Sequence, residues 1–290
     1  MPALTWRWSA AVGGAAIAFF IWPSSATLRF ALSQEPAGAA ATTAEDSQEQ
    51  PDDAEPPPLR TYMGRTIAPF MDASGAEWLI RRTRGREEQP AKLLAALAVE
   101  RGESVCDFGC GNGFYTLALA KRVGAAGKVY AVDIQQEMLD MLSERMGARG
   151  LRNIVPILCT ATDPKLPVGK LDMVLMVDVY HELSHPPEVL ESVRASLRPR
   201  GRLVLVEFRE EDPEVPIKPL HKMGQPQVNR EISANGFKLV DQFDGLPWQH
   251  VLFFARDDSP LPAKALRRWM LPAAAREDES GSAEESDSSR

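Results

Sequence analysis

The sequence has few of the residues that build disulfides or metal centres. It contains three cysteines and four histidines in 290 residues. Three cysteines cannot all pair within one chain, and a disulfide at Cys106 and Cys110 would obstruct the glycine-rich stretch that they flank. No second Cys/His pair at metal-ligand spacing accompanies them. We therefore expect no metal site, and we interpret Cys106, Cys110 and Cys159 as small packing residues.

The sequence also lacks a basic excess. Its formal net charge is −7, but the acids are concentrated near the two ends of the chain. Residues 34–58 carry seven acids and no Lys or Arg, and residues 276–290 carry six acids and two Arg. Residues 59–275 are therefore close to neutral, whereas a duplex-binding domain usually gathers basic residues on one face. We do not expect a nucleic-acid partner.

No apolar run reaches the roughly 20 residues that span a bilayer. Arg7, an apolar stretch over residues 10–22 and small residues around Ser33 have the layout of a signal peptide. We predict export, to the periplasm or another extracytoplasmic space, with cleavage after Ser33. Two alternatives stay open: an uncleaved anchor that associates with a membrane, and a cytoplasmic protein whose start codon is misassigned.

Composition divides the chain into five parts. Residues 34–58 are rich in Ala, Glu, Asp, Gln and Pro, and they have too little apolar surface to offset the entropy of ordering. They predict a disordered linker, as the Ser, Glu and Asp of the tail do for residues 276–290. The predicted parts are a signal or anchor (1–33), the linker (34–58), a helical cap (59–100), a ligand-binding core (101–258) and a C-terminal extension with the acidic tail (259–290).

Strand and helix patterns alternate within this core. Only four residues separate the last two predicted strands, which permits a hairpin but no parallel crossover. The order predicts a doubly wound α/β fold, with a mostly parallel, seven-stranded, Rossmann-like sheet and an antiparallel last strand. Strands are expected at residues 105–108, 128–132, 153–159, 171–177, 202–208, 237–243 and 248–255, and helices at 114–123, 135–146, 187–197 and 227–234.

The first strand leads into a glycine-rich turn with Gly109, Gly111 and Gly113, preceded by Asp107. Glycines there let the backbone turn tightly and approach a ligand. Asp133, twenty residues beyond Gly113, ends the next strand, where an acid can bind ribose hydroxyls; capping the following helix is the alternative. The spacing differs from the G-x-G-x-x-G of dinucleotide sites, and Asp107 would repel a pyrophosphate but attract an ammonium group.

These motifs resemble the class I S-adenosyl-L-methionine (SAM)-dependent methyltransferases, in particular the small-molecule group similar to ubiquinone/menaquinone C-methyltransferases, over residues 90–210. The resemblance implies SAM as cofactor, with the glycine turn at its methionine part. Arg200 departs from the family pattern, which has a glycine in this turn before the fifth strand. The residues that the resemblance assigns to cofactor binding are Asp107, Gly109, Gly111, Gly113, Asp133, Ile134, Ala161, Thr162 and Asp178.

The loop after the fourth strand holds Tyr180, His181 and Glu182, which offer a hydroxyl, a base and a carboxylate where the family's active-site face lies. Proton removal or acceptor alignment by His181 and a purely structural capping and packing cluster are equally good interpretations. His221 and His250 could reach the same opening of the site, although a structural role is favoured for each. Cap residues such as Tyr62, Arg65 and Trp78 could close the site or simply pack.

The sequence therefore predicts an enzyme that transfers a methyl group from SAM to a small-molecule acceptor. A non-catalytic SAM- or nucleoside-binding module is the alternative. An NAD-dependent oxidoreductase is disfavoured by Asp107 and the glycine spacing. The absence of an Asn/Asp-Pro-Pro-Tyr/Phe signature disfavours methylation of nucleic-acid bases. Neither the acceptor nor the oligomeric state is specified.

Overall fold

A computed structural model of the protein describes residues 57–270. The predicted signal segment, nearly all of the predicted linker and the acidic tail lie outside the described residues. Within residues 57–270, no helix combines the length and the apolar character needed to cross a bilayer.

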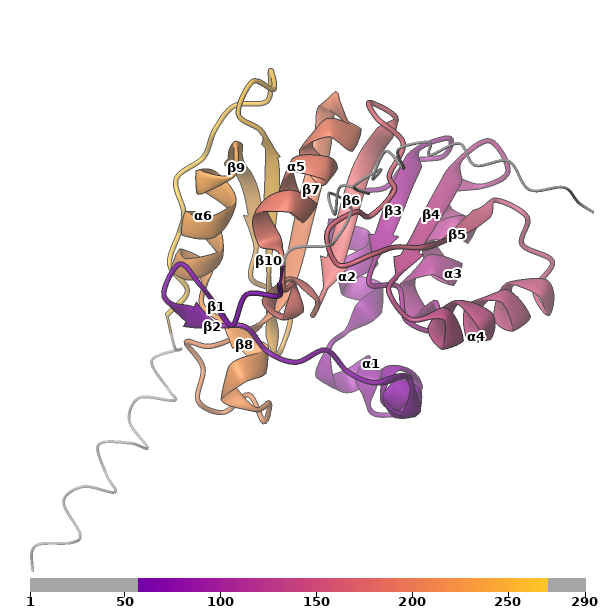
Figure 1. Cartoon of the computed structure of the whole chain (residues 1–290), viewed down its shortest axis with the longest axis horizontal. Coiled ribbons are helices and arrows are strands. Elements are labelled where there is room, and N and C mark those ends of the chain that lie inside the picture. The colour runs from indigo at the N-terminus through magenta and orange to yellow at the C-terminus, as the bar shows by residue number, and fades with distance from the viewer. Residues whose placement is uncertain (1–56, 271–290) are drawn as a thin grey trace, which may run out of the picture. The chain divides into compact units, whose positions relative to one another are not determined.

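A mostly parallel sheet of eight strands forms the centre of the fold (Figure 1). Seven strands follow the order β5-β4-β3-β6-β7-β10-β9, and β8 pairs with the end of β7. β10 is antiparallel to both of its neighbours, which confirms the predicted fold class. The strands are β3 (Ser104–Phe108), β4 (Lys128–Asp133), β5 (Ile154–Leu158), β6 (Leu171–Val177), β7 (Leu197–Arg209), β8 (Lys222–Met223), β9 (Phe237–Phe243) and β10 (Gln249–Arg256).

Helices cover both faces of the sheet, as expected for a doubly wound fold (Figure 1). One core cluster joins α2 (Pro90–Ala96), α3 (Phe114–Val123) and α4 (Gln136–Gly147) to one face. The other cluster packs α5 (Pro186–Ser196) and α6 (Gln225–Ala234) on the opposite face. Residues 173–176 of β6 are fully buried between the two layers, which explains the unbroken apolar run in that strand.

The strand before the last crossover differs from the prediction. β7 begins at Leu197, so the expected turn at Arg200 and Gly201 lies inside the strand, where the register with β6 is irregular. A Cβ at Gly201 would lie 2.7 Å from the carbonyl oxygen of Leu171. The glycine is therefore required by the close approach of two backbones, while Arg200 occupies an exposed position.

Short elements precede the core. A two-stranded sheet of β1 (Thr61–Tyr62) and β2 (Arg65–Thr66) comes first, and the 3-10 helix η1 (Ala73–Ile80) and the helix α1 (Arg84–Glu87) follow. Asn112 Nδ2 donates to the carbonyl of Ala76, and Gln135 Nε2 donates to the carbonyl of Met71. These bonds hold residues 71–80 across the carboxyl ends of β3 and β4, the edge at which ligands bind in this type of sheet.

Candidate cofactor and acceptor site

The glycine-rich turn leaves the carboxyl end of β3. The φ angles of Gly109, Gly111 and Gly113 are +67°, +51° and +83°, in the region that favours glycine. The amide groups of Gly109 and Cys110 both donate to the carbonyl of Val132, at 2.8 and 2.9 Å. The turn is therefore tied to β4, and its backbone is set before any ligand binds.

Two side chains lie against this turn. A Cβ at Gly109 would lie 2.5 Å from Val179 Cγ2, and a Cβ at Gly111 would lie 2.6 Å from Leu79 Cδ1. Val179 follows β6, and Leu79 belongs to η1. The glycines thus allow close approach by side chains of this chain, and their predicted approach to a ligand stays a prediction.

Asp107 lies beneath the turn, with 3% of its surface exposed. Its carboxylate accepts a hydrogen bond from Thr116 Oγ1 at 2.5 Å. Within residues 57–270, no Lys or Arg side chain forms an ion pair with it. Burial raises the pKa of Asp107 to about 6, although the bond from Thr116 acts in the opposite direction. The site therefore contains a buried acid without a cationic partner.

Asp133 ends β4 and joins this strand to the glycine turn. Its Oδ2 accepts from the amide of Gly111 at 2.8 Å, and its Oδ1 accepts from the amide of Gln135 at 3.0 Å. Gln135 is the N-cap of α4, so Asp133 contacts both the glycine turn and the start of this helix. Burial raises the pKa of Asp133, which is 6% exposed.

The other predicted cofactor residues lie around the same edge. Ile134 is 43% exposed beside Asp133, and Ala161 and Thr162 are half-buried in the loop after β5. Asp178 follows β6 with φ +55°, and both of its carboxylate oxygens accept from Gln249 Nε2. Burial raises the pKa of Asp178 well above its usual range. These residues follow β4, β5 and β6 at their carboxyl ends, the same edge of the sheet at which the glycine turn leaves β3.

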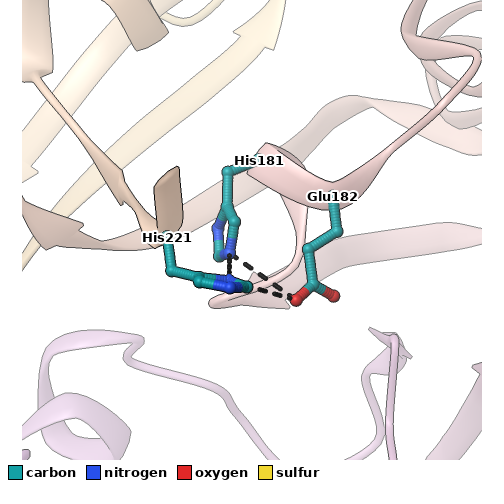
Figure 2. Close-up of side chains that lie close together, drawn as sticks. All are labelled: His181, Glu182 and His221. Atoms are coloured by element: carbon teal, nitrogen blue, oxygen red, sulfur yellow. Dashed lines mark hydrogen bonds and ion pairs between the residues drawn. The ribbon is translucent and has the colours of Figure 1, made fainter. Parts of the chain in front are cut away.

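The loop after β6 forms the 3-10 helix η2 (Tyr180–Glu182), and η3 (Pro219–His221) lies beside it. Figure 2 shows three side chains that point toward one another. His181 Nε2 lies 3.1 Å from His221 Nδ1 and 3.7 Å from Glu182 Oε1, while His221 Nδ1 lies 3.5 Å from the same oxygen. The structure thus brings together His181 and Glu182, and His221 reaches the same cluster.

Glu207, near the end of β7, supports this cluster through a hydrogen bond with His181. Its Oε2 accepts from His181 Nδ1 at 2.7 Å, and its Oε1 accepts from the amide of Tyr180 at 3.0 Å. Burial lowers the pKa of His181, but the charge and hydrogen bond of Glu207 and the charge of Glu182 together outweigh this effect and raise the pKa above its ordinary value. Burial also raises the pKa of Glu182 to about 7, and it lowers the pKa of His221.

Tyr180 does not join the histidines. Its hydroxyl is buried and donates to Glu231 Oε2 of α6 at 2.9 Å. Arg65 pairs with the same carboxylate at 2.9 Å and also donates to the carbonyls of Tyr180 and His181. These contacts anchor the segment around β2 to η2, so the hydroxyl of Tyr180 faces a structural ion pair.

Two other candidates from the sequence do not belong to the group of His181, Glu182 and His221. His250 is fully buried in β10, and its Nε2 donates to the carbonyl of Met223 at 2.8 Å, in agreement with the structural interpretation. Trp78 is 48% exposed, with the guanidinium of Arg81 stacked 3.7 Å from the centre of its ring.

Comparison with known proteins identifies the family of this chain. A family model described as a methyltransferase domain matches residues 99–249, which is more than half of the chain. The chain belongs to this family. It is 33% identical over 119 residues to a ubiquinone/menaquinone biosynthesis C-methyltransferase of Paraburkholderia phymatum, which covers 41% of this chain and 48% of the relative. It is 30% identical over 115 residues to a demethylmenaquinone methyltransferase of Geobacillus stearothermophilus, with 40% and 49% covered.

The chain spans about half the length of the curated relatives it matches. Among solved structures, it is similar to a SAM-dependent methyltransferase from Aquifex aeolicus, with a TM-score of 0.60 and 26% identity over 64% of this chain and 98% of that one. The predicted family, the class I SAM-dependent methyltransferases, is confirmed, and SAM is the cofactor of this class.

The sequence did not lead us to Glu207, which accepts the hydrogen bond from His181 Nδ1. A signal was present, because Glu207 is the single charge in the apolar run from Leu203 to Phe208. A charged residue in a central strand needs a buried partner. The expectation of no metal site rested on the two neighbouring cysteines and the lack of a second Cys/His pair at ligand spacing. It did not consider the group of His181, Glu182 and His221, whose ligand atoms all lie within 4.8 Å of one another.

Proposed function

We propose that this protein transfers a methyl group from SAM to a small-molecule acceptor. The observation that carries the proposal is the contact between Asp133 Oδ2 and the amide of Gly111 at 2.8 Å. It fixes a carboxylate at a strand end directly beside a glycine-rich turn, in a chain of the methyltransferase domain family. A cofactor in which a ribose lies next to an amino-acid part would contact the carboxylate and the glycine-rich turn together.

The residues around the turn fit this cofactor. Asp107 is a buried acid that forms no ion pair with a Lys or Arg of residues 57–270, so the positive charge of a ligand would stabilise it. The hydroxyl of Tyr115, in the first turn of α3, is buried and has no hydrogen-bond partner among residues 57–270. We assign Asp107 and the three glycines to the methionine part, and Asp133 and Ile134 to the ribose. Ala161, Thr162 and Asp178 are the remaining residues that we assign to cofactor binding. When bound, SAM supplies the methyl group on a positively charged sulfur.

Entry of the cofactor requires a rearrangement of the segment over the turn. Leu79 lies where a ligand would contact Gly111, and its segment is held by the bonds from Asn112 and Gln135 to backbone carbonyls. Two hydrogen bonds of this kind contribute about 0.5–1.5 kcal/mol each, which binding can readily offset. Residues 71–80 are therefore expected to move when SAM binds.

The acceptor side of the site is assigned to His181 and Glu182. η2 follows β6 at the same edge of the sheet as the glycine turn, and the charge of Asp133 is close enough to contribute to the raised pKa of Glu182. Methyl transfer is an in-line displacement, so the protein must align the acceptor and, where needed, accept its proton. The names of the relatives make demethylated quinone precursors the first acceptors to test.

Isothermal titration of the full-length chain with SAM and with NAD tests the cofactor. SAM should bind and NAD should not. Asp133→Ala should weaken SAM binding by about 1.5–3 kcal/mol, the cost of losing hydrogen bonds to a charged group. Asp140→Ala, which removes an exposed acid from α4, is the matched control and should bind SAM normally. Equal SAM affinity in Asp133→Ala and the control would refute the ribose assignment.

Release of S-adenosylhomocysteine tests the transfer itself. The full-length chain should release it when incubated with SAM and the correct acceptor. Demethylated menaquinone is the first compound to assay, and a metabolite extract is the second. SAM binding without release from either source would instead support the non-catalytic binding module.

We also infer from residues 1–33 that the protein is exported. Arg7, the apolar stretch and the small residues before Ser33 carry this inference. Fractionation of cells that express the full-length chain, followed by N-terminal sequencing, tests it. Recovery of the intact N-terminus in the soluble cytoplasmic fraction would refute both export and anchoring.

A further inference from the structure

Three donor atoms at the carboxyl ends of β6 and β7 surround one point (Figure 2). The distances between them are 3.1, 3.5 and 3.7 Å, for His181 Nε2, His221 Nδ1 and Glu182 Oε1. A point equidistant from the three atoms lies about 2 Å from each, which matches the bonds of Zn²⁺ to imidazole nitrogen and carboxylate oxygen. The three atoms therefore already have the spacing that one bound ion requires.

Glu207 sets the protonation of the first ligand. Because Glu207 is fully buried and accepts from His181 Nδ1 at 2.7 Å, the Nδ1 atom carries the proton, and in the neutral imidazole Nε2 presents its lone pair to the cluster. A second bond, from the amide of Tyr180, prevents the Glu207 carboxylate from turning away. A carboxylate behind a histidine in this way is the usual support of a metal-binding imidazole.

Hydrogen bonds within the cluster join only two of its three side chains, His181 and His221. One proton between His181 Nε2 and His221 Nδ1 accounts for their contact of 3.1 Å. Within residues 57–270, however, the Glu182 side chain accepts no hydrogen bond, because the two imidazole nitrogens lie 3.5 and 3.7 Å from its Oε1. A divalent cation at the central point would bind the lone pairs of all three residues.

The site also has an open side. Solvent reaches 28% of the His221 side chain and 16% of the Glu182 side chain, whereas His181 is 2% exposed. Three protein ligands with an open position are typical of catalytic rather than structural metal sites. Two imidazoles favour a first-row transition metal over Mg²⁺ or Ca²⁺, which prefer oxygen ligands.

We propose that His181, Glu182 and His221 bind one divalent transition-metal ion, such as Zn²⁺, and that this ion binds an oxygen atom of the methyl acceptor. The metal site stands on the geometry alone, and the part concerning the acceptor rests on the proposed function. A hydroxyl bound to the ion releases its proton to bulk water, which leaves the oxygen anion as the stronger nucleophile. The acceptor is then a small molecule that carries a hydroxyl group, such as a phenol or an enol.

Metal titration of the full-length chain tests the site without any methyl transfer. The protein is purified with its affinity tag removed, stripped with a chelator and titrated with Zn²⁺ by calorimetry, and Co²⁺ is added to a second sample to read its absorption spectrum. We expect one Zn²⁺ per chain and a Co²⁺ spectrum of a nitrogen- and oxygen-bound ion. Mg²⁺ should not compete.

Variants assign the binding to these residues. His221→Asn and Glu182→Gln change partly exposed side chains, and each should weaken Zn²⁺ binding by about 100-fold or more, since even loss of a supporting carboxylate costs 10–100-fold. Glu207→Gln should weaken it by about 10–100-fold. Glu188→Gln, an exposed acid of α5, is the control and should bind Zn²⁺ like the wild type.

Two results would overturn the proposal. One is the absence of saturable binding of one Zn²⁺ per wild-type chain. The other is unchanged Zn²⁺ binding in both His221→Asn and Glu182→Gln. SAM binding, measured separately on the stripped protein, distinguishes the two proposals: Zn²⁺ binding without SAM binding would refute the proposed function and leave the metal site, and the reverse result would refute the metal site alone.

Discussion

Replacement of Asp107 by Asn should make the ligand-free protein more stable near neutral pH. Burial raises the pKa of this acid from its ordinary value of 3.8 to about 6. A raised pKa in the folded state contributes stability that is complete below about pH 3.8 and is lost as the pH rises through about 6. A difference of one pKa unit corresponds to 1.36 kcal/mol. At pH values above about 6, the ionised carboxylate therefore costs the folded state about 3 kcal/mol.

Asn removes this cost but has its own. Its oxygen can still accept from Thr116 Oγ1, although a neutral acceptor forms a weaker bond, and its buried NH₂ group needs a new partner. Together these effects remove about 1–2 kcal/mol of the gain, so Asp107→Asn should be more stable than the wild type by about 1–2 kcal/mol near pH 8. Near pH 4, where the wild-type carboxyl is already protonated in the folded state, the wild type recovers most of this cost, and the variant should become the less stable protein.

Urea unfolding of both proteins at several pH values measures the difference. Other carboxyl groups titrate in the same range, but they are common to both proteins and largely cancel in the comparison. SAM affinity should change in the opposite direction, because the variant lacks the charge that we assign to the amino-acid part of the cofactor. A difference in unfolding free energy that does not vary between about pH 4 and pH 8 would show that the buried charge is not the cause.

Three further predictions concern the turn, the acceptor loop and the ends of the chain. Gly111→Ala should lower the unfolding free energy by about 1–3 kcal/mol, since its φ of +51° and the nearby Leu79 both oppose a Cβ; wild-type stability in urea would contradict this account. His181→Ala should lower turnover by about 10²–10⁴-fold with little change in SAM affinity, and joint loss of SAM binding and thermal stability would mark η2 as structural support. Deletion of residues 34–58 or 276–290 should leave the melting temperature nearly unchanged, whereas a drop of many degrees would show a docked segment.

The sequence predicts the core of this fold well because each core element is long and regular enough to reveal its own pattern. The observed bounds of α3, β6 and β9 agree with the predicted ranges, and all three carry a clear apolar period or run. The small sheet of β1 and β2 and the helices η1 and α1 were not predicted individually. They contain two to eight residues each, so tertiary contacts such as the Arg65–Glu231 ion pair decide their structure, and no local period reports such contacts.

The acceptor site shows where the missing information lies. β8 pairs with β7 in parallel, with Phe208 opposite Lys222. Glu207 and His221 immediately precede these two residues, so they lie at the same edge of the sheet. Glu207 also bonds to His181 after β6, the strand on the other side of β7. Forty residues therefore separate His181 from His221 in the sequence, while one strand separates them in the fold. Ligand spacing along the chain identifies sites built on one loop or helix, but this cluster depends on the order of strands in the sheet, which only the assembled fold determines.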